Sequence, residues 1–489
     1  MTSTGLAAER SRWLALVVLC AGMLMVILDG TIVNVALPAI QDDLGFSQSS
    51  LAWVVNAYLI PFGGLLLLAG RLGDLLGRRS VFLAGLGVFT GASLICGLAQ
   101  SQEVLIGARF IQGAGGALAS AVILGMIVTM FPEPRERATA IGIYSFVASA
   151  GASIGLLAGG VLTQAISWHW IFFVNLPIGV ATALLALRLI GRDRGIGLAQ
   201  GADVLGALLV TAGLMLGVYT IVGAAEHGWA SARTLGLGAL SIALLAGFVL
   251  RQARARTPLM PLRILRSRNV SGANVVQMLM VAGLFGMFFL GVLYMQRVLG
   301  YDAIETGLAF LPVAVLIGAF SLAVTPRLTL RLGDRPVLLA GLPLIIAGLA
   351  FFARVPEAAS YTTDILPAML LMGAGAGLSF PSLMNLAMSG ATPADAGLVS
   401  GLVNTTLQVG GALGLAVLAT LASSRTEDLV ADGEGSAAAL TGGYSLAFIV
   451  AAALVGVALA VAATVIRSRA PAREETAPQE PSLRSAEGG

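Results

Sequence analysis

One acidic residue, Asp29, lies inside the apolar run LMVILDGTIVNVALP at residues 24–38. A charged group at the centre of a membrane helix costs about 2.5 to 3.5 kcal/mol, so such groups face a bundle interior or a cavity and have a partner. Burial also disfavours the charged form of a carboxyl group, which makes proton binding and release possible. Asp29 is therefore either a proton or cation site or a hydrogen-bonded structural residue.

Arg109 is the expected partner of Asp29. The apolar segment that holds Asp29 ends near residue 36, and the segment that holds Arg109 begins near residue 104. If the two segments cross a membrane in opposite directions, a rise of 1.5 Å per residue places both groups roughly 8 to 10 Å below the outer edge. We expect protonation of Asp29 to release Arg109. The alternative is that the Arg109 side chain extends to the outer interface.

Three further polar pairs lie on single helical faces: Gln112 with Arg109, Gln277 with Asn274, and Gln408 with Asn404. A buried amide is costly unless it is hydrogen-bonded. These residues therefore mark either contacts between helices or a water-filled cavity for a substrate. Asn34, five positions from Asp29, points to a different helical face and is a structural candidate.

Other kinds of chemistry have little support. Cys20 and Cys96 lie in apolar runs, and His169 and His227 lie far apart, so we expect no disulfide, metal or haem site. The chain has no lysine, which excludes a G-x-x-x-x-G-K-[ST] nucleotide-binding loop. An enzyme at membrane depth would need clustered carboxylates, a histidine pair or a nucleophile beside a base. We expect no enzymatic activity, no cofactor and no nucleic-acid partner.

The elements that position these groups are predicted membrane helices. The 489 residues are 57% hydrophobic and 11% charged, with a mean hydropathy of +0.92 and 62 glycines, a composition typical of a polytopic membrane protein. Windows of roughly 19 to 20 residues predict fourteen spans, at residues 13–36, 51–70, 80–99, 104–130, 138–163, 168–190, 203–223, 232–250, 271–295, 304–326, 336–354, 362–389, 396–422 and 442–466.

The placement of arginine supplies an independent test of this count. If both termini are cytoplasmic, the inside segments hold 23 of the 28 arginines. The outside segments hold only Arg233, Arg297, Arg354 and Arg425, and Arg109 lies within a span. This alternation satisfies the positive-inside rule, which a wrong span count would break. We therefore predict a multi-pass protein of the cell membrane with both termini in the cytoplasm.

The tetrapeptide RLGD occurs twice, at 71–74 after the second span and at 331–334 after the tenth. If spans seven and eight are an insertion, the two copies occupy equivalent loops of two six-helix halves, a transporter architecture with its substrate site between the halves. We predict a cytoplasmic N-terminus (1–12), an N-terminal half (13–190), a linker with two additional spans (191–270), a C-terminal half (271–466) and a disordered tail (467–489).

Several segments resemble signatures of the major facilitator superfamily, specifically its fourteen-helix drug:proton antiporter branch. GRLGDLLGRR at 70–79 is similar to the superfamily's loop between helices 2 and 3. LDGTIVNVALP at 28–38 and ARFIQGAGGA at 108–117 resemble the branch's signatures in helices 1 and 4. Further similar segments are SWHWIFFVNLPIG at 167–179 and GLVSGLVNTTLQVGGALG at 397–414. The resemblance implies an all-α fold with two six-helix halves and two extra central helices, and a role for Arg109 in proton relay or helix pairing.

Two motifs carry mechanical expectations. In the loop at 70–79, Gly70, Asp74, Gly77, Arg78 and Arg79 match the pattern, which implies a cytoplasmic gate; the alternative is a simple positive-inside hairpin. In the fifth span, Gly151, Gly155 and Gly159 recur every four residues beside Gly160, so another helix can approach closely and form a hinge or seal between halves. Leu156 stands where the motif usually has proline.

Together these features predict a secondary active exporter that exchanges protons for drugs, antibiotics or other amphipathic compounds by alternating access. Its expected partners are protons, an amphipathic small molecule and membrane lipid, and we expect the monomer to be functional. Two alternatives stay open. Proton-linked uptake or facilitated transport fits the missing proline of the fifth span, and the exporter could serve one natural product.

Overall fold

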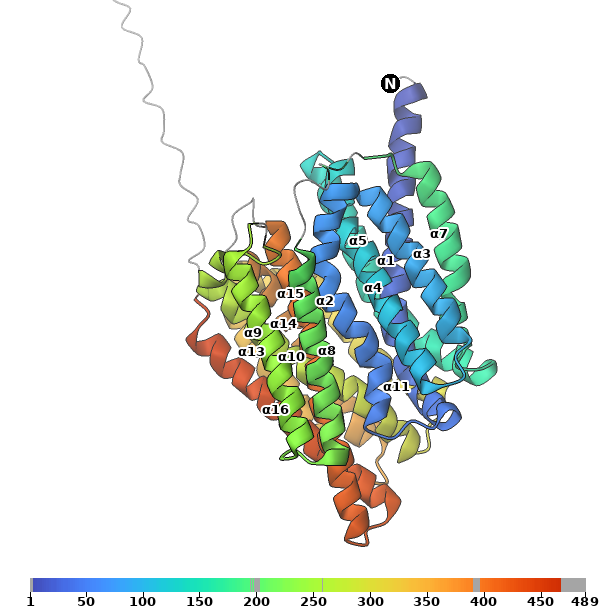
Figure 1. Cartoon of the computed structure of the whole chain (residues 1–489), viewed down its shortest axis with the longest axis vertical. Coiled ribbons are helices and arrows are strands. Elements are labelled where there is room, and N and C mark those ends of the chain that lie inside the picture. The colour runs from blue at the N-terminus through green and yellow to red at the C-terminus, as the bar shows by residue number, and fades with distance from the viewer. Residues whose placement is uncertain are drawn as a thin grey trace, which may run out of the picture.

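The computed structural model describes residues 3–193, 195, 197, 203–256, 258–389 and 396–467. All the regular elements in these ranges are helices (Figure 1). The predicted disordered tail falls almost entirely at residues 468–489, which lie outside the described residues.

The N-terminal region contains the helices α1 (Ser3–Leu44), α2 (Trp53–Leu76), α3 (Arg78–Gly97), α4 (Gln102–Met130), α5 (Pro134–Ala165), α6 (Trp170–Phe173) and α7 (Asn175–Leu189), with a short 3-10 turn η1 (Ser50–Ala52) before α2. Local signals set several of these boundaries. The Ser101 side chain caps α4 by accepting the N–H of Val104, and Pro134 opens α5. Gly77 separates α2 from α3 with φ at 95°, a conformation that favours glycine.

The middle of the chain forms the helix pair α8 (Val204–His227) and α9 (Ala232–Arg254) and the 3-10 turn η3 (Leu262–Arg266). The C-terminal region contains α10 (Arg268–Arg297), α11 (Ala303–Ala319), α12 (Thr325–Leu332), α13 (Asp334–Phe352), α14 (Leu366–Ser389), α15 (Ala396–Ala431) and α16 (Ser436–Thr464), with π-helical turns η4 (Phe320–Val324) before α12 and η5 (Tyr361–Ile365) before α14.

In the described part of the chain, 13 helical segments are long and apolar enough to cross a membrane. They fall at thirteen of the predicted spans. The remaining prediction, 138–163, lies within α5, a helix of 32 residues in which Ile154–Ala165 forms a shorter apolar segment. Helix α1 continues beyond the predicted span to Leu44 and includes the polar residues that follow the apolar run.

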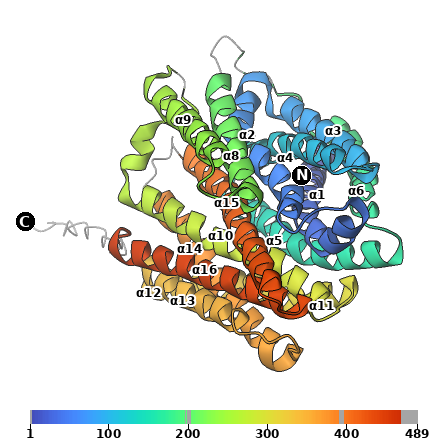
Figure 2. The same cartoon turned by 60° about the horizontal axis from the view of Figure 1, so that its bottom comes forward.

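The helices form two groups, α1–α7 and α10–α16, with the α8–α9 pair beside them (Figure 2). Following the orientation predicted from arginine, we call the end where α1 begins the inner end and the end where α1 finishes the outer end. The two groups meet where α11 packs on α5 and α15 packs on α2. Helix α8 contacts both α2 and α15, so the extra pair lies along this second contact.

The two RLGD copies lie in corresponding places, but their residues do not correspond. Gly77 and Gly333 each have positive φ and each separates two helices, so they are equivalent. In the first copy this glycine follows RLGD, whereas in the second it is part of RLGD. The equivalent arginines, Arg79 and Arg335, each donate to a backbone carbonyl, of Leu187 in α7 and of Ala463 in α16, both at 2.6 Å. The two segments therefore occupy equivalent places between two helices, but the second RLGD tetrapeptide lies four residues later than the position equivalent to the first.

Candidate functional site

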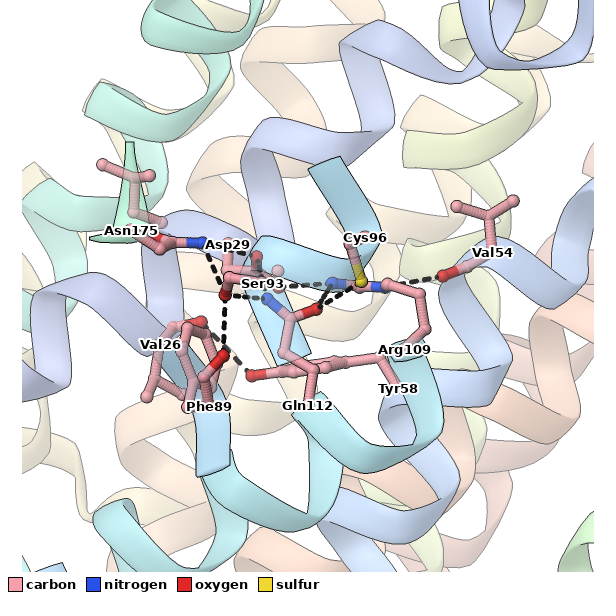
Figure 3. Close-up of polar contacts among 12 residues, drawn as sticks. Val26, Asp29, Val54, Tyr58, Phe89, Ser93, Cys96, Arg109, Gln112 and Asn175 are labelled. Carbon is pink, nitrogen blue, oxygen red and sulfur yellow. Dashed lines mark hydrogen bonds and ion pairs between the residues drawn. The ribbon is translucent and has the colours of Figure 1, made fainter. Parts of the chain in front are cut away.

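A network of buried polar side chains lies inside the α1–α7 group, with Asp29 at its centre (Figure 3). Asp29 and Gln112 are 0% exposed and Arg109 is 1% exposed. Arg109 forms a short ion pair with Asp29 Oδ2, and Gln112 Nε2 donates to Asp29 Oδ1 at 2.7 Å. Arg109 also donates to Gln112 Oε1 at 2.7 Å, so the three groups form a closed ring.

Asn175 and Ser93 complete this network from α7 and α3. Asn175 Nδ2 donates to Asp29 Oδ1 at 2.9 Å and lies 3.4 Å from Ser93 Oγ, which also accepts from Gln112 Nε2 at 2.8 Å. Ser93 in turn donates to the Phe89 carbonyl at 2.8 Å. The carboxylate of Asp29 therefore accepts from three side chains on two different helices.

The remaining contacts of Arg109 hold it in the protein interior. Its Nε donates to the Val54 carbonyl at 3.0 Å, and its guanidinium carbon lies 4.4 Å from the ring centroid of Tyr58 and 5.7 Å from that of Phe172. Cation–π contacts of this kind stabilise a desolvated guanidinium. Arg109 thus pairs with Asp29 and does not extend to the outer interface.

This arrangement balances charge and hydrogen bonding around Asp29. One negative and one positive group are both desolvated, and breaking such a pair leaves an uncompensated charge in the interior. A proton on Asp29 would neutralise the carboxylate and convert one acceptor oxygen into a donor, so at least one present donor would have to turn away. The network can therefore exist in two arrangements that differ by one proton.

The glycines of the fifth span belong to α5 and pack against α1, the helix that carries Asp29. A Cβ on Gly155 would lie 2.0 Å from Thr31 Oγ1, one on Gly151 2.9 Å from Leu24 Cδ1, and one on Gly159 2.6 Å from the Ile32 carbonyl. Three glycines thus bring α5 against the turns of α1 on either side of Asp29. Gly160 faces a different helix, because its Cβ would lie 2.6 Å from the Ala303 carbonyl of α11.

The segment 70–79, predicted to be a loop, forms the end of α2, Gly77 and the start of α3, and its residues contact the inner ends of α4 and α7. Arg78 donates to the Gly125 carbonyl and to Thr129 Oγ1, both at 2.9 Å, and pairs with Asp74 at 3.2 Å. Asp193 accepts the backbone N–H groups of Arg78 and Arg79 at 2.5 and 3.1 Å. A Cβ on Gly77 would lie 2.8 Å from the Asp193 carbonyl, whereas Gly70 has open space around it. These contacts hold helix ends together within the α1–α7 group. The predicted cytoplasmic gate, which needs a contact between the two groups at the inner end, stays a prediction.

The predicted cavity residues do not form one cluster. Asn274 and Gln277 lie between α10 and α15, where Thr406 donates to Asn274 Oδ1 at 2.8 Å and Gln277 donates to the Val403 carbonyl at 3.0 Å. Gln408 faces α2, since its Cβ lies 2.8 Å from the position of a Cβ on Gly63, and its Oε1 is buried without a partner. Asn404 is exposed on α15. Asn274 and Gln277 therefore form contacts between α10 and α15. Gln112 belongs to the Asp29 network.

At the outer end, side chains join the two helix groups. Gln296 of α10 donates to the Val35 carbonyl at 3.1 Å, and Arg297 pairs with Asp42 and donates to the Pro38 carbonyl at 3.2 Å. Between α5 and α11, Gln164 donates to Asp302 at 3.0 Å and accepts the N–H of Ile304 at 3.3 Å. These contacts close the outer end above Asp29.

Sequence reasoning missed Asn175, Ser93 and Tyr58 as members of the network. Asn175 is a polar residue in the apolar segment WIFFVNLPIG, which was a usable signal. Ser93 gave none, because a single hydroxyl in a membrane helix can bond to its own backbone, as Ser93 does to Phe89. Among the described residues, no three His, Cys, Asp or Glu side chains group as metal ligands, and Cys20 and Cys96 are free.

Comparison with known proteins decides the family. The family described as Major Facilitator Superfamily matches residues 19–415. The chain belongs to the major facilitator superfamily. Two solved transporter structures share the fold: the POT family transporter PepTSo (TM-score 0.66, 15% identity, 93% of this chain and 98% of that one) and an inward-facing bacterial homologue of the human lysosomal transporter Spinster (TM-score 0.63, 17% identity, 92% and 96%).

Within the superfamily, the chain is similar to proteins named for antibiotic resistance and export. It is 40% identical to a puromycin resistance protein of Streptomyces alboniger, over 95% of this chain and 93% of that protein. It is also 40% identical to a cephamycin export protein of Amycolatopsis lactamdurans, over 89% and 88%. A tetracenomycin C resistance and export protein of Streptomyces glaucescens is 35% identical, over 86% and 78%. The chain is a multi-pass membrane transporter of this superfamily.

Proposed function

We propose that this transporter exports an antibiotic or a similar amphipathic small molecule in exchange for protons. The names of its relatives support export of this class of compound. The buried pair of Asp29 and Arg109 carries the proposal of proton coupling, because a secondary transporter needs a group that binds and releases its coupling ion inside the bundle. We also propose that both termini face the cytoplasm and that the monomer is the working unit.

In the proposed cycle, a proton reaches Asp29 from outside when the outer end is open. Neutral Asp29 no longer holds the Arg109 guanidinium, which then pairs with Gln112 and the Val54 carbonyl alone. In the present arrangement Asp29 is fully buried under the outer-end contacts. Proton entry and proton release therefore require different conformations, which is the condition for coupling.

Helix α1 connects the proton site to the outer end. Asp29 lies in its middle, and the groups that accept from Gln296 and Arg297 lie about two to four turns further along the same helix. The glycine face of α5 rests on the turns around Asp29, while Gly160 touches α11. A shift of α1 on protonation would move its own contacts with α10 directly. It would also move the contact between α5 and α11, because α5 packs on α1.

Two alternatives remain distinct outcomes of a transport assay. Proton-linked uptake or facilitated transport predicts accumulation inside cells that express the protein. An exporter dedicated to one natural product predicts movement of one antibiotic class only, and the resistance names of the relatives cover several unrelated compounds.

The test is puromycin transport into inverted proteoliposomes with an imposed pH gradient. We expect wild type to accumulate puromycin faster when the gradient is present, and Asp29→Asn, which keeps the shape but cannot titrate, to lose that acceleration. The matched control is Asp428→Asn, an exposed residue of α15. Equal gradient-driven rates in wild type and Asp29→Asn would exclude Asp29 as the coupling site, and uptake by intact cells would exclude export.

A further inference from the structure

A groove of about 310 Å³ lies at the inner end of the α8–α9 pair. One residue of α8 and the last turns of α9 line it: Leu209, Gly247, Leu250, Arg251, Arg254 and Ala255. Gly247 lies about 10 Å deeper along α9 than Arg254. The groove is therefore apolar toward the membrane interior and carries two guanidinium groups toward the inner end.

The helix surface around the groove is apolar and uncovered. Leu205 is 49% exposed, Leu208 58% and Leu250 56%. On a membrane helix, aliphatic side chains exposed to this degree contact lipid acyl chains. A molecule in the groove would thus have hydrocarbon on its outer side.

Gly247 keeps the groove open. A Cβ at this position would meet only Leu209 Cδ2, at 3.9 Å, which is ordinary contact. A larger side chain here would fill the space without displacing the backbone of either helix.

A buried carboxylate fixes the first arginine. Arg251 Nε donates to Asp203 Oδ1 at 2.9 Å, and Asp203, itself 2% exposed, also accepts from the Gly206 N–H at 2.9 Å and from Gln252 at 2.8 Å. Burial raises the pKa of Asp203, but these hydrogen bonds together lower it by more than burial raises it. The pKa of Asp203 is therefore below its ordinary value. Asp203 is charged and accepts from Arg251 through Nε, which leaves the terminal nitrogens of the half-exposed Arg251 for a ligand.

The second arginine, Arg254, is exposed and has no ion-pair partner in the part of the chain that the structure describes. Counting Asp203, Arg251 and Arg254 together leaves one net positive charge at the mouth of an apolar groove. The complementary ligand is a monoanion with a hydrocarbon tail. The cytoplasmic leaflet contains such molecules as anionic phospholipids, and basic pockets between membrane helices on that side bind their headgroups.

We propose that this groove binds one anionic phospholipid of the inner leaflet. Its phosphodiester accepts hydrogen bonds from the terminal nitrogens of Arg251 and from Arg254, and one acyl chain lies over Gly247 against Leu209 and Leu250. Because α8 packs on both α2 and α15, the lipid is bound on the helix that borders the contact between the two groups.

The experiment is native mass spectrometry of the full chain purified from vesicles of equal parts phosphatidylglycerol and phosphatidylcholine. We expect wild type to retain one phosphatidylglycerol in preference to phosphatidylcholine. Arg254→Gln removes an exposed guanidinium group that has no ion-pair partner among the described residues. It should lower this preference about five-fold, which is the change in affinity expected from one arginine beside an anionic headgroup. Gly247→Leu fills the groove without a change of charge and should abolish retention.

Matched controls separate this site from general attraction of lipid to basic residues. Arg266→Gln removes an exposed arginine of η3, and Gly236→Leu adds the same side chain to α9 at a glycine with open space around it; both should retain phosphatidylglycerol as wild type does. Unchanged retention in Arg254→Gln and Gly247→Leu would overturn the proposal. So would displacement of the lipid by millimolar inorganic phosphate, since the apolar groove would then contribute nothing.

Discussion

At the scale of single residues, Asn175 tests how the charge of Asp29 is maintained. Its amide donates to Asp29 Oδ1 at 2.9 Å. A hydrogen bond to a charged group contributes about 1.5 to 3 kcal/mol, so its loss favours the protonated form of the carboxyl group. For Asn175→Leu, which keeps the branching at Cγ, we expect half-maximal proton-driven transport to move about one to two pH units higher. The measurement is the initial rate in proteoliposomes against external pH.

Ser93→Ala is the matched control for Asn175→Leu. Ser93 contacts Gln112 and Asn175 but donates no hydrogen bond to Asp29. We expect its pH profile to move by less than half as much. Equal shifts for the two variants would indicate a general loosening of the network, and no shift for Asn175→Leu would show that Asn175 only packs.

Arg109 is predicted to be as important for stability as for coupling. Removing one partner of a buried ion pair costs about 3 to 5 kcal/mol because the other charge is left unpaired. Arg109→Gln should therefore lower the thermal unfolding temperature in detergent strongly at neutral pH. The double variant Asp29→Asn with Arg109→Gln should recover most of that loss, since both charges are absent. If the double variant is as unstable as Arg109→Gln, the loss comes from the Tyr58 and Phe172 contacts of Arg109 and not from the ion pair.

At the scale of helices, the glycine face of α5 sets the distance to α1. A methyl group on Gly155 would lie 2.0 Å from Thr31 Oγ1, so Gly155→Ala must push the two helices apart beside Asp29. We expect a lower unfolding temperature and loss of transport. Gly87→Ala, at an exposed position of α3 with open space, should be neutral or slightly stabilising because alanine favours the helix.

Thr31→Ala in the Gly155→Ala background checks the cause. It removes the hydroxyl that the new methyl group meets, so it should restore part of the unfolding temperature. Transport that is normal in Gly155→Ala alone would mean that close packing of α5 on α1 is not required.

The sequence predicted the helices and the central ion pair for clear physical reasons. Apolar runs long enough to span a membrane leave few alternatives, and a lone acid and a lone base at equal depth have few other partners. It marked Asn175 as a polar residue in an apolar segment, but the contacts of Asn175 with Asp29 and of Ser93 with Gln112 depend on how α7 and α3 rotate about their axes. The same limit applies to Asn274 and Gln277, which contact α15, whereas the sequence left open whether they contact a helix or line a cavity.

At the scale of the whole molecule, the contact between Gln164 of α5 and Asp302 beside α11 is expected to survive mild acidity. The pKa of Asp302 lies below its ordinary value because the carboxylate accepts the N–H of Glu305 and the amide of Gln164. Asp302 therefore stays charged at pH values at which a buried carboxyl group can take up a proton. In the proposed cycle, the contact between α5 and α11 is therefore released by movement of the helices and not by titration of Asp302.

If the outer end must open in each cycle, joining α5 to α11 there should stop transport. Gln164 and Ile304 are suited to this, because the Gln164 side chain contacts the Ile304 N–H at 3.3 Å and the nearby Gly160 packs against the same turn. In Gln164→Cys with Ile304→Cys, a short bifunctional thiol reagent should abolish proton-driven transport, and reduction should restore it. The native Cys20 and Cys96 are buried, so each single variant treated alike should stay active. Full transport by the cross-linked protein would mean that substrate and protons pass without separation of α5 from α11, which would contradict alternating access through the outer end.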